Sequence, residues 1–398
     1  MPEGDVGSKS DQAIVSVHDR IDAIPAEDWD ACAGSDNPFV SYAFLSALEE
    51  SKSACAQQGW LPQHLTVSIA DEIVGCVPMY LKNHSYGEYV FDHGWAHAYE
   101  RAGGRYYPKL QVSVPFTPVT GRRMLVREGH SPSDVVPLLI TGLQQVADHH
   151  GVSSLHVTFP EEAEWEAFGA AGWLQRTGQQ YHWENDGYAT FDDFLAALAS
   201  RKRKAIKKER RQALESGIDL KVVTGSDLTS NHWDAFYRFY RNTSDRKWGE
   251  AYLTRPFFDM LGERMADKVA LVFGTKDGLP VCGALNMIGK ETLYGRNWGC
   301  SAHYRFLHFE ACYYQAIDFA IQRGLKRVEA GAQGQHKVQR GYLPVRTYSA
   351  HLIRDPSLRR AVDSFLDEER RMVDWEVEAV TDQASPFRKD CSADPDKS

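Results

Sequence analysis

The sequence lacks the cysteine patterns that mark disulfide frameworks and metal sites. Its 7 cysteines are scattered, and no CxxC or Cys/His ligand spacing joins them. It also lacks any run of the roughly 18 apolar residues that a membrane-spanning helix needs. Residues 1–12 are acidic and polar, unlike the apolar core of a secretory signal. We therefore expect reduced thiols, no bound metal, no transmembrane segment and a cytoplasmic protein.

An excess of positive charge is missing too. The chain has 45 Lys and Arg against 54 Asp and Glu, which gives a formal net charge of -9. This charge argues against binding of nucleic acid or anionic membrane over the whole surface, so any polyanion site must be local. The 398 residues, 43% of them hydrophobic, exceed the size at which one core usually stops growing. They therefore predict two globular domains.

Several familiar catalytic motifs are absent as well. The sequence has no G-x-S-x-G elbow, no Walker loop, no Rossmann glycine motif and no HExxH. Its 15 histidines are dispersed rather than grouped at ligand spacing. These absences argue against the commonest serine hydrolases, P-loop enzymes, dinucleotide-binding enzymes and zinc proteases.

What the sequence does contain is a diverged internal repeat. Landmarks recur in the same order, although no run of identical residues repeats. Each copy predicts an opening helix, an antiparallel hairpin, a helix ended by glycine and a strand directly after it, hence an α/β fold with a mixed sheet. The paired landmarks are Trp29-Asp30 and Trp233-Asp234, hairpins 67–80 and 272–287, Gly151 and Gly324, strands 155–159 and 327–330, and Gly172-Trp173-Leu174 and Gly341-Tyr342-Leu343.

The repeat and the composition set the expected boundaries. Polar, low-complexity ends are typical of disordered termini. The expected segments are a disordered N-terminus (1–12), a first domain (13–185) with an insertion near 85–112, a second domain (186–360) preceded by a basic helix (192–216), a C-terminal helix (361–380) and a disordered tail (381–398).

Several longer stretches are similar to a known family. They are residues 106–110, 114–121, 180–183, 201–211, 331–337 and 340–344. In these stretches, and in its tandem order of elements, the chain resembles a bacterial family described as FemAB-like predicted N-acyltransferases. That family is related to the Fem ligases of peptidoglycan crossbridge synthesis. The resemblance implies two tandem GNAT-like acyltransferase domains.

The resemblance also implies a chemistry. It predicts an N-acyltransferase or aminoacyltransferase that moves an acyl group to an amine acceptor, such as a peptidoglycan precursor. No tightly bound cofactor is expected, and the acyl donor, aminoacyl-tRNA or acyl-CoA, is a co-substrate. Neither 119–125 nor 299–308 matches the Q/R-x-x-G-x-G/A loop that holds CoA pyrophosphate in GNAT enzymes, which favours tRNA as partner. An acyl-CoA-dependent acetyltransferase and a non-catalytic RNA- or phosphate-binding protein are the alternatives.

The second copy is the stronger candidate for the reacting site. Where the first copy predicts a helix before Gly172, the second has a shorter polar segment punctuated by glycine. Acyl transfer to an amine needs a proton acceptor and donors for the developing oxyanion. We predict Glu329 or His336 as base and Tyr342 as proton donor; a structural Glu329–Arg340 ion pair and simple packing of Tyr342 are the alternative. The predicted substrate-binding residues are Arg296, Trp298, Gln333, Lys337 and Arg340.

The first copy carries a second polar cluster in and near the insertion. Polar and aromatic loops of this kind often line binding sites, although a purely structural lid would have the same composition. Arg122 and Arg123 follow a strand in a turn that could hold phosphate. The alternative is that the two arginines only make the surface soluble. The candidates for substrate binding in this copy are Asp92, His93, Tyr107 and Lys109.

Residues 201–211 hold eight basic side chains among eleven. Few apolar positions point inward, so most of these charges face water or a partner. Repulsion at this density disfavours a helix without an anion to neutralise it, which favours a clamp for the phosphates of tRNA, a nucleotide or a pyrophosphate-linked lipid over a merely solvated face. The predicted phosphate-binding residues are Arg201, Lys202, Arg203, Lys204, Lys207, Lys208 and Arg211.

Overall fold

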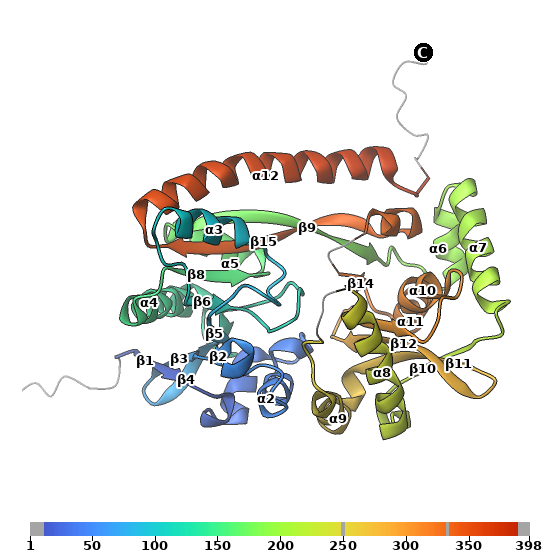
Figure 1. Ribbon diagram of the computed structural model, residues 1–398, viewed down its shortest axis with the longest axis horizontal. Coiled ribbons are helices and arrows are strands. Elements are labelled where there is room, and N and C mark those ends of the chain that lie inside the picture. The colour runs from blue at the N-terminus through green and yellow to red at the C-terminus, as the bar shows by residue number, and fades with distance from the viewer. Residues whose placement is uncertain (1–11, 248–250, 332–333, 389–398) are drawn as a thin grey trace, which may run out of the picture. The chain divides into compact units, whose positions relative to one another are not determined.

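The structure is a computed structural model that describes residues 12–247, 251–331 and 334–388. The chain folds into two compact units (Figure 1). The first comprises residues 1–178, 252–260 and 347–371, and the second comprises 179–251, 261–346 and 372–398. Each unit therefore contains one copy of the predicted repeat and is completed by segments from distant parts of the chain.

The first unit is built on two sheets. One has the strand order β1-β3-β4-β7, and the other has the order β15-β8-β6-β5-β2, in which only β6 and β8 are parallel. Its strands are β1 (Ile14–His18), β2 (Trp60–Pro62), β3 (His64–Ile69), β4 (Glu72–Val77), β5 (Met79–Lys82), β6 (Lys109–Val112), β7 (Leu125–Val126), β8 (Ser154–Thr158) and the later part of β15 (Leu343–Ile353). Its helices are α1 (Ala26–Ala33), α2 (Tyr42–Glu50), α3 (His93–Arg101), α4 (Pro132–His150) and α5 (Glu162–Ala170).

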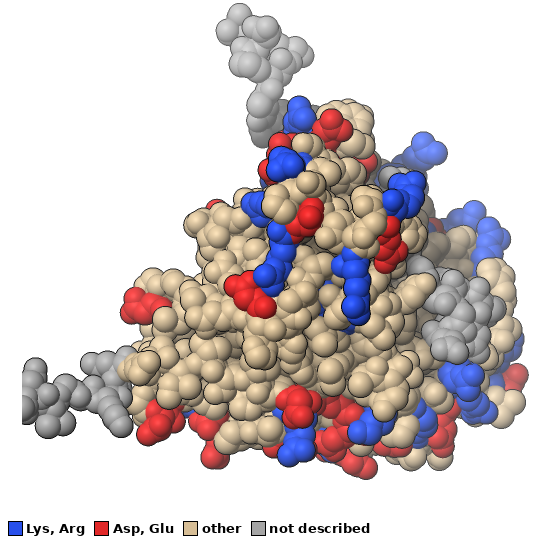
Figure 2. Space-filling model, turned by 60° about the vertical axis from the view of Figure 1, so that its left-hand side comes forward, with Lys and Arg blue, Asp and Glu red and all other residues tan. Residues whose placement is uncertain are grey.

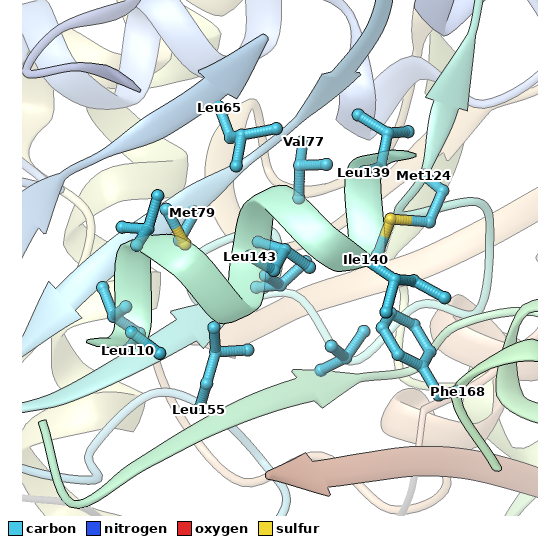
Figure 3. Packing of buried hydrophobic residues seen from close by; sticks show 14 of the residues in the cluster. Leu65, Val77, Met79, Leu110, Met124, Leu139, Ile140, Leu143, Leu155 and Phe168 are labelled. Atoms are coloured by element: carbon cyan, nitrogen blue, oxygen red, sulfur yellow. The ribbon is translucent and has the colours of Figure 1, made fainter. Parts of the chain in front are cut away.

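Helix α4 forms the centre of the first core. Its apolar residues recur at three- and four-residue spacing, so one face of the helix is apolar. Leu139 and Leu143 on that face are fully buried and lie among Leu65 of β3 and Leu155 of β8 (Figure 3). The helix ends at Gly151, which has the left-handed φ of 59° that a helix-ending glycine supplies. The predicted helix, glycine and strand are thus confirmed.

The second unit has one sheet in the order β10-β11-β12-β13-β14-β9, and within it only β13 and β14 are parallel. Its strands are β10 (Asp219–Val223), β11 (Val269–Lys276), β12 (Leu279–Ile288), β13 (Thr292–Cys300), β14 (Arg327–Glu329) and the later part of β9 (Leu174–Glu184). Its helices include α6 (Phe191–Ala197), α7 (Ser200–Leu214), α8 (Ser230–Lys247), a continuous run of α10 (Leu307–Phe309), the π-helix η7 (Glu310–Tyr314) and α11 (Gln315–Gln322), and the short 3-10 helix η8 (Gln335–Arg340). Helices α9 (Arg255–Arg264) and α12 (Pro356–Ala384) pass from one unit to the other.

Both predicted hairpins are present. Asp277 and Gly278, between β11 and β12, have φ of 51° and 76°, and Ala70 and Asp71 occupy the same region between β3 and β4. Two successive residues with positive φ form the turn that suits tight β-hairpins. In the second core, Ile317 of α11 packs against Leu293 of β13. The same order of hairpin, helix and strand therefore recurs in the two units.

Three expected boundaries differ in the structure. The sequence predicts one basic helix over 192–216, whereas α6 and α7 are separate, because Leu198 is extended and forms a β-bridge with Phe387. The C-terminal helix α12 is longer than 361–380 at both ends. The predicted disordered tail begins at 381, yet α12 continues to Ala384 and Phe387 packs on the second core. Residues 1–11 and 389–398, also expected to be disordered, lie outside the described residues.

Candidate active site

The parallel strands β13 and β14 diverge in the second unit. They pair only at Thr292–Arg327, Leu293–Val328 and Tyr294–Glu329, after which β14 ends while β13 continues to Cys300. Within the described residues, the later half of β13 pairs with β12 alone.

A β-bulge lies at the point of divergence. Asn286 pairs with Gly295 and Leu285 pairs with Asn297, so Arg296 is the extra residue of β13. A side chain at Gly295 would come within 3.2 Å of the carbonyl oxygen of Glu329, so the two strands separate directly after a close approach. Bulges re-aim side chains and are frequent beside active sites. The bulge sets the direction of Arg296 and Trp298, both half-buried.

Glu329 is the last residue of β14 and its side chain is buried. Its Oε2 lies 3.9 Å from Nε2 of His182 on β9. Burial, with smaller effects of Arg327 and Lys337, lowers the pKa of His182 to about 3. The imidazole is therefore neutral at neutral pH, so this contact with Glu329 is not itself an ion pair.

The segment after β14 is the polar loop that the sequence singled out. Lys337 on η8 is buried, and its Nζ donates hydrogen bonds to the carbonyl groups of Ala330 at 2.6 Å and Gly331 at 2.9 Å. Burial lowers the pKa of Lys337 to about 8. The ammonium group thus shapes the chain where β14 ends. Gln333, a predicted substrate-binding residue, lies outside the described residues.

His336 is exposed at the start of η8. Its Nε2 lies 3.0 Å from the hydroxyl of Tyr313, and its ring packs beside Phe309, with centroids 5.5 Å apart. Partial burial, then the charges of Arg340 and Lys337, lowers the pKa of His336 below its ordinary value. A neutral imidazole that reaches solvent can accept a proton. His336 therefore has the accessibility that a general base needs.

Arg340 and Tyr342 are held by other partners. The guanidinium of Arg340 lies 3.5 Å from the ring centroid of Phe309 and forms an ion pair with Glu209 of α7 at 2.8 Å. Tyr342 is fully buried and donates its hydroxyl to the carbonyl of Tyr313 at 3.1 Å. This arrangement suits the packing role for Tyr342 that the sequence left open. Glu209 and Tyr313 are site residues that sequence reasoning missed.

The basic helix α7 lies against the polar loop and has two distinct faces. On the inner face Lys202 donates to Gln339 at 2.8 Å, and Ile206 and Ala213 are buried. The outer face carries exposed charges at three- and four-residue spacing, which places them in one stripe. We call Arg201, Lys204, Lys208 and Arg211 the outer stripe.

The other basic residues of α7 lie between these faces. Lys207 forms an exposed ion pair with Asp192 at 3.1 Å, and Arg203 is half-buried. Arg210 bonds Glu310 and Asp318, at 2.9 and 2.7 Å, and so ties α7 to the π-helix. Of the predicted phosphate-binding residues, the outer stripe has the exposure that a phosphate contact requires.

In the first unit the structure brings Asp92 and Lys109 together. The buried ammonium of Lys109 bonds Asp92 at 2.5 Å, Glu88 at 2.7 Å and Ser85 at 2.8 Å. Burial alone would raise the pKa of Asp92, but the charge of Lys109 holds it well below its ordinary value. One lysine therefore fastens three residues of the insertion through charge-assisted bonds.

Tyr107 and His93 occupy the edge of this cluster. The hydroxyl of Tyr107 lies 2.9 Å from that of Ser85 and so joins the cluster indirectly. His93 is half-buried and stacks on Phe91, with ring centroids 6.3 Å apart. The predicted set is thus divided between a buried ionic core, Asp92 and Lys109, and an outer rim.

Arg122 and Arg123 face main-chain oxygens. Arg123 is buried and donates to the carbonyls of Thr158 at 3.0 Å and Val119 at 2.6 Å, while Arg122 donates to Ala33 at 2.7 Å. Thr158 ends β8, the counterpart of β14, and the amide of Gly121 bonds Phe159 directly after it. In the first unit the chain itself therefore fills the place where the second unit has diverging strands.

With this geometry established, the family follows from comparison with known proteins. A family model described as FemAB-like, peptidoglycan biosynthesis and recognition, matches residues 20–389. The chain belongs to this FemAB-like family. The predicted resemblance is confirmed over nearly the whole chain. No protein with curated annotation matches.

Solved structures share the fold of this FemAB-like chain at low sequence identity. FemX is 12% identical with a TM-score of 0.54, covering 85% of this chain and 98% of that one. The C-terminal domain of a putative lysylphosphatidylglycerol synthetase from Agrobacterium fabrum is 9% identical with a TM-score of 0.54, covering 85% and 96%. A protein of unknown function from Bacteroides thetaiotaomicron is 13% identical with a TM-score of 0.50, covering 85% and 100%. These likenesses confirm the predicted α/β fold class, which FemX shares.

No helix in the described part of the FemAB-like chain has the length and apolarity to span a bilayer. No group of three or more His, Cys, Asp or Glu side chains in that part could hold a metal ion.

Proposed function

We propose that the chain is an N-acyltransferase whose reacting site is the divergence of β13 and β14 in the second unit. The observation that carries this proposal is the separation of β13 from β14, because the loop that holds His336 and Lys337 begins where β14 ends. A strand edge supplies N–H donors at fixed positions, which is what a developing oxyanion needs. Membership of a family described by peptidoglycan biosynthesis supports a cell-wall precursor as the amine acceptor.

The reaction can be written on these residues. The acceptor nitrogen attacks the acyl carbonyl of the donor, a new C–N bond forms, and N–H groups of β13 stabilise the oxyanion. His336 accepts the proton of the attacking nitrogen, because its lowered pKa keeps it neutral. The bond from the carbonyl carbon to the donor's oxygen or sulfur then breaks, and the leaving group takes up the proton. Base catalysis of this kind contributes about 10² to 10⁴ in rate.

Glu329 is the second proton acceptor in the proposal. It is buried at the end of β14, on the strand that flanks the proposed carbonyl position. Its neighbour His182 is neutral at neutral pH. A carboxylate can act as general base when the proton that it takes lies within hydrogen-bond reach. Glu329 can therefore serve as base where the acceptor amine reaches deeper than His336.

The donor in this proposal carries phosphates. The outer stripe of α7 lies on the helix whose inner face holds the loop of His336, so a phosphate chain bound there would run close to the site. An exposed row of cations suits a nucleic-acid backbone. Aminoacyl-tRNA is therefore the donor that we favour, with acyl-CoA as the alternative.

The first unit has a different task in the proposal. Its equivalent strand end is filled by the segment around Arg123, whose guanidinium is already bonded to carbonyl groups. This leaves no matching edge for a donor carbonyl among the described residues of that unit. The proposal therefore assigns one reacting site to the chain.

The test begins with a thermal-shift screen of charged tRNA, acyl-CoAs and cell-wall precursors. A ligand present at 100 times its dissociation constant adds about 2.7 kcal/mol to the free energy of unfolding. Pairs of hits are then incubated with the protein, and the acylated product is identified by mass spectrometry. We expect a product from a tRNA donor and an amine-bearing precursor, and we expect acetyl-CoA to give a negligible shift.

Variants locate the site once a product is found. His336→Ala and Glu329→Gln should together lower kcat by about 10² or more, since both proton acceptors are lost. His97→Ala removes an exposed histidine of the first unit that is not among the predicted site residues, and it should leave kcat unchanged. Full activity of the double variant would place the chemistry elsewhere.

A non-catalytic RNA-binding protein is the second candidate, because the outer stripe alone would suffice for it. It predicts RNA binding that weakens steeply with salt. It also predicts no covalent product with any donor, which separates it from the first proposal.

A further inference from the structure

The basic stretch of α7 contains a single acidic residue, and that residue faces the candidate site. Glu209 stands between Lys208 and Arg210. Its carboxylate accepts three hydrogen bonds from the guanidinium of Arg340, at 2.8, 2.9 and 3.2 Å, and another from the hydroxyl of Tyr314. Forked bonds between Arg and a carboxylate fix orientation as well as adding energy.

Arg340 in turn forms a hydrogen bond with the main chain of η8. Its Nη1 donates to the carbonyl of His336 at 2.6 Å, while the guanidinium plane covers Phe309. The side chain of Arg340 is only 8% exposed. A buried cation that loses its anion is strongly destabilised in place, so Arg340 depends on Glu209 to remain there.

The other end of the loop is fastened from within. Lys337 holds the carbonyls of Ala330 and Gly331, one residue after His336. Lys202 of α7 adds a bond to Gln339. The backbone of His336 therefore lies between one fixed point that belongs to the loop and another that belongs to α7.

We propose that Glu209 is a positioning residue for the acyl-transfer site, acting through Arg340 to hold the His336 imidazole against Tyr313. The two faces of helix α7 then have separate roles. The outer stripe binds phosphate groups, and the inner face positions the residues of the site. The proposal rests on the function proposed above for His336, but the placement of the ring can be measured without any substrate.

The experiment compares Glu209→Gln with Glu215→Gln in the full chain. Glu215 directly follows α7, is exposed, and forms a surface ion pair with Arg211. Both variants change the net charge equally. The imidazole of His336 is followed by ¹⁵N NMR during a pH titration, with His336→Gln used to assign its signal. Backbone amide exchange is measured over residues 335–341.

In Glu209→Gln we expect Arg340 to leave its place over Phe309. The pKa of His336, which Arg340 helps to lower, should then rise toward its ordinary value. Amide exchange in η8 should accelerate about tenfold, since the loop loses one fixed point. Glu215→Gln should match the wild type in both measurements.

A charge-swapped pair provides rescue. Glu209→Arg combined with Arg340→Glu restores an ion pair at the same place and should return the exchange rates toward those of the wild type. If Glu209→Gln fails to fold, Glu209→Asp retains the charge on a shorter arm, and we expect the same changes on a smaller scale. The proposal is overturned if the His336 titration and the exchange rates of the Glu209 variants equal those of Glu215→Gln.

The outcome separates this proposal from the proposed function. If no donor or acceptor gives a product, the NMR and exchange results still show whether Glu209 positions His336. When a substrate pair is known, Glu209→Gln should lower kcat with KM for the donor unchanged, because the outer stripe is intact. A rise in KM with unchanged kcat would contradict a positioning role.

Discussion

At the scale of single residues, Gly299 shows how close packing restricts the sequence of β13. A Cβ at this position would stand 2.2 Å from the carbonyl oxygen of Phe239 on α8. We expect Gly299→Ala to lower the free energy of unfolding by about 1–3 kcal/mol, since backbone cannot rotate aside as a flexible side chain can. Urea denaturation measures the change. Gly94→Ala is the control, because a Cβ at Gly94 meets nothing within 4 Å.

The buried Lys82 leads to a prediction of how the free energy of unfolding depends on pH. Burial lowers its pKa in the folded protein to about 7 from the value of 10.5 for an unperturbed lysine. Between these values the unfolded chain binds more protons than the folded one, so the free energy of unfolding rises with pH. We expect Lys82→Met to flatten this rise between pH 7 and 10 in urea titrations.

The control for Lys82 is the exposed Lys221, which has a surface partner, Asp219. Lys221→Met should retain the wild-type slope over the same pH range. Equal slopes for the wild type and Lys82→Met would show that the lysine is hydrated in the folded protein.

At the scale of elements, the segment around Arg123 in the first unit should contribute to the stability of the fold. The buried guanidinium of Arg123 satisfies carbonyl groups of Val119, Gly121 and Thr158. Arg123→Met leaves these groups without their donor, and we expect a loss of about 2–4 kcal/mol in unfolding free energy. Arg122→Met, which removes one bond to Ala33, should cost less. If Arg123→Met were as stable as the wild type, other contacts would have to satisfy these carbonyl groups.

The same elements show what could be read from the sequence. The helices ended by Gly151 and Gly324 and the hairpin turns were predictable, because spacing and turn residues act locally. The bond between Arg340 and Glu209 joins residues 131 positions apart, and no local pattern encodes it. The signal that could have identified Glu209 was an acid within a basic stretch.

Burial explains why the roles of some polar residues could not be assigned from the sequence. Lys109, Arg123 and Tyr342 carry groups typical of binding sites, yet all three are fully or almost fully buried. A sequence shows that a residue is polar but does not show whether its partners are substrate atoms or neighbouring chain. Assignment of such residues therefore needs the packing around them.

At the scale of the whole molecule, acidic residues outnumber basic ones. On the face shown in Figure 2, Lys and Arg lie among Asp and Glu, and other residues make up most of the surface. With a net charge of -9, binding to a polyanion must rely on a local group of cations. The outer stripe of α7 is the group that the structure offers for this purpose.

Salt dependence tests this last point. Binding of a mixed-sequence RNA oligonucleotide is measured from low to high salt for the wild type and for Arg201→Gln, Lys204→Gln and Lys208→Gln combined. Each lost phosphate contact lowers the slope of log K against log salt by about 0.7, so the triple variant should lose about two units.

The control for this triple variant combines Lys221→Gln, Lys268→Gln and Lys326→Gln, three lysines that are at least partly exposed and paired with acids. It removes the same charge from other places on the surface. If only net charge mattered, both triple variants would lower the slope equally, and the outer stripe would not be the docking surface. A loss confined to the α7 variant would mean that the helix which builds the site with its inner face also binds the phosphate chain with its outer one.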